Sequence, residues 1–189
     1  MIAHALAILL VLSVPSAASA PEAPGTTVIR IDDVITQETA ESVEAAVTKA
    51  EGPVIVRINS PGGSVLPGLR IIRSLLSAPG PVICEVEDLA ASMAAIILES
   101  PGCGVRRVHV YSLIMFHEAA VSGVDTLRQN ESGALAERLK AVNLALAALV
   151  APRLGLTVEE YLTRTLGGRE IWVVGLYAVS AHVADEVRS

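Results

Sequence analysis

A strand pattern that ends in two adjacent glycines constrains the fold of this chain more than any other feature. Residues 53–58 (Pro-Val-Ile-Val-Arg-Ile) are apolar and mostly β-branched, which is typical of a buried strand in a parallel sheet. Asn59–Ser64 (Asn-Ser-Pro-Gly-Gly-Ser) follows, and residues 65–78 then have a helical pattern. Because glycine has no Cβ, backbone N–H groups at this turn approach a ligand closely. Such groups suit a carboxylate, a phosphate or a developing oxyanion.

Strands and helices alternate along most of the chain. Strand patterns also occupy residues 26–31, 82–86, 108–111 and 113–116, and helical patterns occupy residues 36–50, 90–98, 125–150 and 157–166. Strands that alternate with helices of this length form right-handed βαβ crossovers. We therefore expect an α/β fold with a mostly parallel sheet and flanking helices. Since aromatic residues make up only 3% of the chain, the core must consist of Ala, Val, Ile and Leu.

The first twenty residues have the pattern of a targeting segment. Residues 5–14 are an apolar run too short to span a bilayer, and small residues at cleavage-site spacing follow up to Ala20. We predict a secretory signal peptide at 1–20, a spacer at 21–25 and one domain at 26–189. The chain is then exported, to the periplasm or the medium. The alternatives are an N-terminal helix of the domain or an uncleaved anchor.

Charge and cysteine content limit the partners of the chain. A net charge of −6 without a basic patch argues against a nucleic-acid partner. Two cysteines do not make a disulfide framework, and pairing of Cys84 with Cys103 stays open. No CxxC motif or His/Cys cluster indicates a metal, and we predict no cofactor.

Two residues that follow strand patterns are candidates for nucleophilic catalysis. Ser92 lies in an alanine-rich stretch just after one strand, where the unpaired N–H groups of a first helical turn stabilise negative charge. His117 follows another strand, and a neutral imidazole is the usual general base for a serine hydroxyl. The alternatives are a buried structural serine and a structural histidine. His109 and His182 compete for the role of base.

Three pieces of sequence together resemble a known family. The Asn59–Gly63 motif, the Ala-Ala-Ser-Met-Ala stretch around Ser92 and the Met-Phe-His sequence that ends at His117 are similar to the proteolytic subunit of the Clp protease. The spacings, 29 residues from Gly63 to Ser92 and 25 from Ser92 to His117, look like those of that family. The likeness covers roughly residues 26–189, and three motifs in register are far more specific than one.

The resemblance implies a fold and an activity. The fold is the spiral of ββα units of the Clp protease and crotonase type, in which the helix at 125–149 is the handle through which rings of subunits stack. The activity is that of a serine endopeptidase that acts on peptides or unfolded chains as a homo-oligomeric ring. An apolar seam supports the handle helix: Leu135, Leu139, Val142, Leu146 and Leu149. The seam packs either on the chain's own core or against a neighbouring subunit.

The resemblance also implies roles for individual residues. Ser92 would be the nucleophile, His117 the general base and Glu170 the third member of the triad. The backbone N–H groups of Gly63 and Met93 would form the oxyanion hole. The residues that would bind an extended peptide are Gly62, Gly63, Ser64 and Val65.

The chain departs from the family pattern in several places. Glu170 stands where the family normally has Asp, and the alternative for Glu170 is a loop charge paired with Arg169. Asp88 replaces a small residue, which would narrow or charge the substrate cleft. The first strand pattern begins almost directly after the predicted signal peptide. The family's segment that meets a hexameric ATPase is therefore expected to be missing, and an ATPase partner is doubtful.

Because of these departures, two other functions are alternatives to a serine endopeptidase. A catalytically weak or inactive member of the fold would act as an oligomeric peptide-binding scaffold. A crotonase-type enzyme that stabilises a thioester enolate is disfavoured, because the chain is short and export would separate it from coenzyme A.

Overall fold

The computed structural model describes residues 24–120 and 129–189. In chain order the elements are β1 (Thr27–Ile35), α1 (Gln37–Lys49), β2 (Val54–Gly63), α2 (Val65–Leu76), β3 (Val82–Ala91), α3 (Met93–Leu98), β4 (Val105–His109), β5 (Leu113–Phe116), α4 (Gln129–Val150), η1 (Ala151–Leu154), α5 (Val158–Thr165), β6 (Ile171–Val174), η2 (Gly175–Tyr177) and β7 (Glu186–Arg188). The predicted signal peptide and the start of the predicted helix at 125–150 lie outside the described residues, so the signal peptide stays a prediction.

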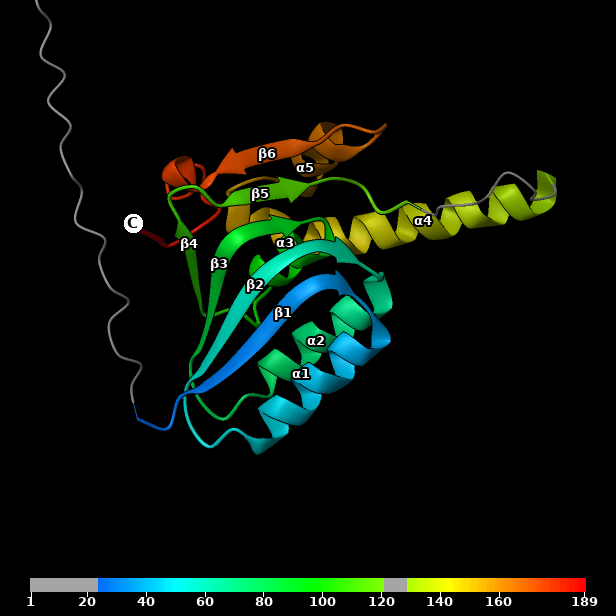
Figure 1. Ribbon diagram of the computed structural model, residues 1–189. Helices are drawn as coiled ribbons and strands as arrows, with labels where there is room; N and C mark the ends of the chain where they lie inside the picture. Colours follow the sequence, from blue (N-terminus) through cyan, green and yellow to red (C-terminus); the bar gives the residue numbers. More distant parts are fainter. Residues whose placement is uncertain (1–23, 121–128) are drawn as a thin grey trace, which may run out of the picture.

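One sheet organises the described residues. The strands β1-β2-β3-β4-β7 are neighbours in that order and run parallel. Strand β5 leaves this path, because it pairs in parallel with the end of β3 and antiparallel with β6. Helices α1 and α2 lie side by side along β1 and β2 (Figure 1). The predicted α/β fold with a mostly parallel sheet is confirmed.

Aliphatic side chains fill the core, as the composition predicts. Val56, Ile58 and Ile97 are fully buried in the main cluster. The chain's single Phe, Phe116, is also buried, and its ring meets Tyr161 edge-on with 6.3 Å between the ring centroids.

Helix α4 has a packed end and a projecting end. Leu146 and Val150 near its C-terminus are buried, whereas the first turns of α4 extend beyond the rest of the domain (Figure 1). The apolar seam therefore packs on the chain's own core only in its C-terminal part. In the part of the chain that is described, no single helix is long and apolar enough to cross a membrane. Helices α4 and α5 meet that requirement only as a pair bent by 110°.

Three strands continue further than the sequence predicts, beginning with β1, which runs to Ile35 instead of ending at residue 31. Strand β2 runs through the glycines to Gly63 because it pairs with β1 that far, and β-bulges accommodate the extra residues. Strand β3 runs to Ala91 because Ala90 and Ala91 pair with β5. Helix α3 therefore begins at Met93, and the predicted start at Ala90 was wrong. Tertiary pairing overrides the helical propensity of the two alanines.

Three other strands also differ from the prediction. Strand β4 occupies Val105–His109, whereas the sequence indicated residues 108–111. Strands β6 and β7 were not predicted at all. They have only 4 and 3 residues, and each is defined by pairing with a distant strand, β5 for β6 and β4 for β7.

A disulfide bond joins Cys84 on β3 to Cys103 in the segment after α3, with 5.5 Å between their Cα atoms. Both cysteines are fully buried. The pairing that the sequence left open is thus decided by the fold, which brings the segment after α3 back against β3. The bond ties the chain beyond the C-terminus of α3 to the sheet.

Candidate active site

Ser92 stands at the junction between β3 and α3. Its φ of 55° and ψ of −122° lie outside the regions that residues other than glycine usually adopt. The turn is fixed from both sides, because Ser92 N–H donates to Met115 O (2.8 Å) and Ser92 O accepts from Ile96 N–H (3.1 Å). A sharp strand-to-helix turn of this kind presents a nucleophilic side chain at the end of a sheet.

Strand pairing brings His117 to Ser92. Strand β5 pairs with the end of β3 in a register that sets Ala91 beside Met115, so the residues just beyond the two strands are neighbours. Ser92 Oγ and His117 Nε2 are 2.7 Å apart, which is hydrogen-bond distance. With Nε2 unprotonated, the imidazole accepts the hydroxyl proton, as a general base for Ser92 must.

Gly62 passes too close to the nucleophile for any side chain. A Cβ on Gly62 would lie 2.6 Å from Ala91 O and 2.9 Å from Met93 N, and the φ of Gly62 is +95°. The β2 backbone thus runs beside the start of α3. Gly63 and Met93, the two predicted oxyanion-hole residues, both line the cavity at Ser92.

A cavity of about 190 Å³ opens at Ser92 and His117. Its lining consists of Gly63, Val65, Ser92, Met93, Ile96, His117, Glu118, Ala119, Ala120 and Leu146. The lining combines aliphatic residues with the polar Ser92, His117 and Glu118, and polar and apolar atoms contribute about equally to its surface. A larger groove of about 530 Å³ shares Glu118, Ala119 and Ala120 with it and extends along α4 and α5.

The residues predicted to bind a peptide differ in whether their backbone N–H groups already donate hydrogen bonds within the domain. Ser64 N–H donates to Ile35 O (3.0 Å), and Gly62 N–H donates to a serine hydroxyl within β2 (3.1 Å). These two N–H groups are therefore already used inside the domain. Gly63 and Val65 line the cavity, and of this group they are the residues placed to contact a peptide.

Glu170 is not joined to His117. Its Oε2 accepts a hydrogen bond from the Trp172 indole N–H (2.7 Å), and no hydrogen bond within the described residues connects it with His117. Nor does Arg169 take Glu170 as its partner, since Arg169 Nε donates to Leu166 O (2.8 Å). Of the predicted triad, the structure assembles the pair Ser92 and His117, and the predicted contact of Glu170 with His117 is not formed.

Sequence comparisons identify the family of this chain. The sequence profile described as Clp protease matches residues 25–188. The chain belongs to the Clp protease family. Among its relatives, the ATP-dependent Clp protease proteolytic subunit 1 of Corynebacterium jeikeium (strain K411) is 31% identical over 165 residues, which cover 84% of this chain and 82% of that protein.

Two similar proteins come from Rhodococcus jostii (strain RHA1). Its ATP-dependent Clp protease proteolytic subunit 2 is 27% identical over 160 residues, or 84% of this chain and 79% of the relative. Subunit 3 is 35% identical over 115 residues, or 58% of this chain and 55% of the relative. These likenesses assign the Clp protease family, and the chemistry of this member follows from its own side chains.

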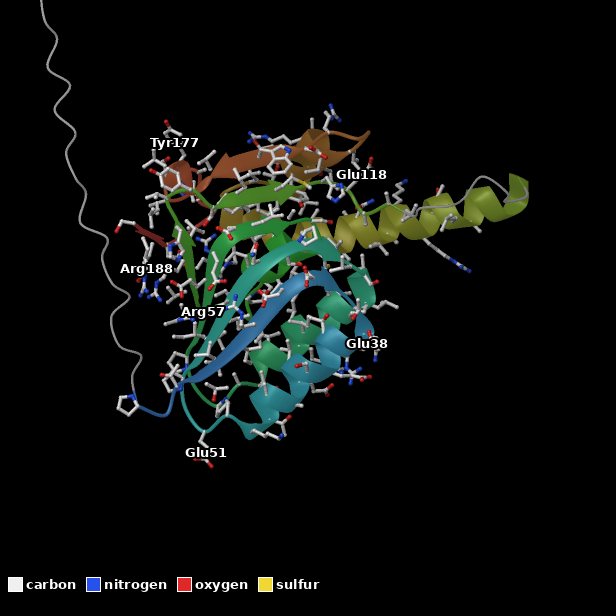
Figure 2. All side chains as sticks on the ribbon, viewed as in Figure 1. Glu38, Glu51, Arg57, Glu118, Tyr177 and Arg188 are labelled. Carbon is white, nitrogen blue, oxygen red and sulfur yellow. A yellow bond between two sulfur atoms is a disulfide. The ribbon has the colours of Figure 1, made fainter. Side chains whose placement is uncertain are left out.

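Glu118 is a residue of this Clp protease site that the sequence did not indicate. Its Oε1 accepts hydrogen bonds from the N–H groups of Gly167 and Gly168, each at 2.9 Å. Both glycines have a φ of +74°, which favours glycine. Glu118 lies beyond the end of β5, on the same side of the domain as the projecting end of α4 (Figure 2). It thus anchors the turn that immediately precedes Arg169 and Glu170.

Asn143 on α4 is a second residue that the sequence did not indicate. Its Oδ1 accepts from Ala119 N–H (2.7 Å), and its Nδ2 donates to Ala119 O (3.3 Å). The Asn143 amide therefore makes two hydrogen bonds with the backbone of Ala119 and holds the segment after His117 against α4. A single Asn within an apolar seam gives no signal of this role in the sequence.

Asp88 lies outside the cavity lining. Asn59 Nδ2 donates to Asp88 Oδ2 at a long 3.5 Å, and the acidic residue in the lining is Glu118. The predicted effect of Asp88, a narrower or charged cleft, is not seen at the cavity. Within the described residues, no group of three His, Cys, Asp or Glu side chains has an arrangement that would hold a metal ion.

A buried charge cluster fixes the end of α3 remote from Ser92. Glu99 is fully buried and accepts from Arg106 Nη1 (2.5 Å), while Arg106 Nη2 donates to Asp185 Oδ1 (2.8 Å). Burial raises the pKa of Glu99 to about 8, although Arg106 acts to lower it. The hydrogen bonds from Arg106 lower the pKa of Asp185. The cluster joins α3, β4 and the segment before β7.

Proposed function

We propose that this Clp protease family member is a serine peptidase that hydrolyses peptide bonds in peptides or unfolded chains. Ser92 is the nucleophile, His117 the general base, and the N–H groups of Gly63 and Met93 are the oxyanion-hole donors. Glu170, which is bonded to Trp172 in the arrangement described, is the carboxylate that would orient His117 once that bond is broken. The observation that carries the proposal is the 2.7 Å contact between Ser92 Oγ and His117 Nε2, on a strained turn that faces a cavity.

The proposed reaction has two halves. Ser92 Oγ attacks the peptide carbonyl carbon, its proton passes to His117 Nε2, and the oxyanion accepts hydrogen bonds from the backbone. His117 then gives the proton to the leaving amine nitrogen as the C–N bond breaks, which leaves an acyl group on Ser92. A water molecule attacks the acyl carbon and gives a proton to His117, which passes it to Ser92 Oγ as the ester bond breaks, so the acid is released and both residues are restored.

The cavity lining supports a preference for apolar side chains beside the scissile bond. Val65, Ile96 and Leu146 contribute aliphatic surface to a space of about 190 Å³. A side chain that replaces water on this surface is stabilised in proportion to the apolar area that it buries. Fluorogenic peptides with an aliphatic residue at this position are the substrates of choice for the assays below.

Labelling with a fluorophosphonate tests the proposed nucleophile. The Oγ–P bond forms as the P–F bond breaks, fluoride leaves, and the serine proton goes to His117. We expect the mass of the folded protein to rise by one probe, with the adduct on the peptide that contains Ser92. Ser100 and Ser112 are buried and hydrogen-bonded, so they serve as internal comparisons. A folded protein that stays unlabelled while a known serine peptidase reacts would count against the proposal.

We further propose that the chain acts outside the cytoplasm and without an ATPase partner, although its relatives are named ATP-dependent. Two features support this. Residues 1–20 have the pattern of a signal peptide, and Cys84 and Cys103 form a disulfide, a bond that persists in oxidising compartments. ATP-driven unfolding is absent from such compartments, so the substrates are peptides or chains that are already unfolded.

Expression of the full chain in a bacterial host tests the location. We expect the protein in the periplasm or medium, with its N-terminus created after Ala18 or Ala20. Its mass should be lower by two hydrogens than that of the reduced form. Recovery from the cytoplasm with Met1 in place and both thiols free would contradict the proposal.

A second candidate function is an oligomeric scaffold that binds peptides without cleaving them. The observation in its favour is the hydrogen bond between Glu170 and Trp172, which leaves the described part of the chain without a carboxylate on His117. Both candidates share a homo-oligomer, which membership of the Clp protease family supports. Light scattering measures the oligomer, and peptide turnover separates the two candidates.

A further inference from the structure

The β5–β6 ribbon places Glu170 opposite His117. In the antiparallel register, Met115 pairs with Trp172 and Phe116 with Ile171, so His117 and Glu170 form the next pair outward. Residues two apart on a strand point to the same face, so Glu170 and Trp172 share a face with His117. Cβ atoms of directly opposed residues lie about 5 Å apart, and a glutamate side chain spans such a gap. Both partners of Glu170, the indole and the imidazole, are therefore within its reach.

The second ring nitrogen of His117, Nδ1, can donate a hydrogen bond to the Glu170 carboxylate. Its Nε2 faces Ser92 Oγ, and when Nε2 accepts the hydroxyl proton, the ring proton is on Nδ1. Among residues 24–120 and 129–189, no acceptor is hydrogen-bonded to Nδ1. The neighbouring carboxylate of Glu118 holds the N–H groups of Gly167 and Gly168. Glu170 is the carboxylate that the register sets opposite the ring.

We propose that Trp172 is a positioning residue that controls the triad, because its indole N–H competes with His117 Nδ1–H for the Glu170 carboxylate. The inference rests on the proposed peptidase function. In the arrangement described, the indole holds Oε2 at 2.7 Å and the triad is open. Rotation of the Glu170 side chain breaks this bond and forms the bond to His117, which completes the triad.

The backbone around Glu170 is held, so the exchange is a side-chain movement. Glu118 fixes the two glycines before Arg169, and β6 begins at Ile171 directly after Glu170. Trp172 is 52% exposed, so its ring is not locked in the core. A phenylalanine at this position keeps an aromatic ring on the same face and lacks the N–H donor. Trp172→Phe therefore isolates the hydrogen bond from the packing.

The kinetic test is a double-mutant cycle on peptide turnover by the full mature chain. Because loss of one hydrogen bond is commonly equivalent to a severalfold change in an equilibrium, Trp172→Phe is expected to raise kcat about fivefold with KM unchanged. Glu170→Leu is expected to lower kcat, and in that background Trp172→Phe should have no further effect, because leucine accepts no hydrogen bond. Tyr111→Phe is the matched control, because Tyr111 is 88% exposed and precedes β5. An unchanged kcat, or an equal gain in the Glu170→Leu background, overturns the proposal.

Fluorescence gives a second measurement, because Trp172 is the only tryptophan in the chain. Labelling of Ser92 by a fluorophosphonate transfers the serine proton to His117, and the positive ring then attracts Glu170 away from the indole. We expect labelling to change the Trp172 emission of the wild type toward that of unlabelled Glu170→Leu, in which the indole has no acceptor at position 170. The emission of the Glu170→Leu variant itself should not respond to labelling. Identical emission in all four samples contradicts the proposed competition.

The outcomes separate this inference from the proposed function. If Ser92 is labelled and turnover requires Ser92, but Trp172→Phe leaves kcat unchanged, only the positioning role of Trp172 is lost. If no variant is labelled or turns over peptide, both the peptidase function and the inference fail.

Discussion

With a saturating apolar peptide as substrate, Ser92→Ala is expected to lower kcat by about four to six orders of magnitude. The variant removes the atom that forms the bond to the substrate carbonyl. Alanine keeps the Cβ, and His117 is the described hydrogen-bond partner of the lost hydroxyl, so the strained turn keeps its backbone contacts. Circular dichroism and the oligomer size should therefore match those of the wild type. Steady-state turnover of a fluorogenic peptide measures the effect.

Two further variants show whether Ser92 and His117 act together in the same proton transfer. His117→Ala should lose a similar factor, and the double variant should be no worse than either single one, because both remove the same proton transfer. Ser180→Ala is the matched control, since the Ser180 hydroxyl donates to Tyr177 O (2.9 Å) on the surface. Turnover by Ser92→Ala above about one hundredth of the wild-type rate would show that Ser92 is not the nucleophile, because background catalysis is far slower.

The order of strands and helices was predictable because hydrophobic period and Gly/Pro breaks are local signals. The alternation of strand and helix patterns from residue 26 onward predicted the βαβ units and hence the parallel sheet. Strand ends were not predictable in the same way. Ala90 and Ala91 have helical propensity, and only pairing with β5 makes them part of β3. The same pairing creates the sharp turn at Ser92.

The nearness of Ser92 and His117 was predictable from the family resemblance and not from local sequence. A serine in an alanine-rich stretch and a histidine after an apolar strand each have structural alternatives. The roles of Glu118 and Asn143 could not be predicted, because both act on backbone groups that the fold brings to them. The conformation of Glu170 was also beyond the sequence, which fixes its place in the chain but not which donor its carboxylate accepts from.

At neutral pH, Arg106→Ala is expected to lower the free energy of unfolding by about 3–5 kcal/mol, because it leaves several buried acceptors without their donor. Arg106 donates to the Glu99 carboxyl group and to the carbonyls of Arg153 and His182. Glu99 is fully buried, and the Arg106 side chain is 8% exposed. Arg107→Ala is the matched control on the next residue of β4. Arg107 Nε lies 2.8 Å from Glu186, and the side chains are 11% and 50% exposed. Because water reaches Glu186 when Arg107 is removed, no acceptor is left buried, and stability should fall by only about 1 kcal/mol. Urea unfolding of both variants measures the difference.

The pH dependence of unfolding tests the same cluster. Because burial raises the pKa of Glu99 from 4.5 to about 8, folded Glu99 keeps a proton that the unfolded chain has released. Its contribution to stability is complete below about pH 4.5 and declines as the pH rises toward 8. Glu99→Gln should flatten this decline, and at neutral pH Glu99→Gln with Arg106→Ala should be more stable than Arg106→Ala alone, since glutamine is neutral without taking up a proton. If Arg106→Ala is as mild as Arg107→Ala, or if the double variant gains nothing, the far end of α3 is not held by these charges.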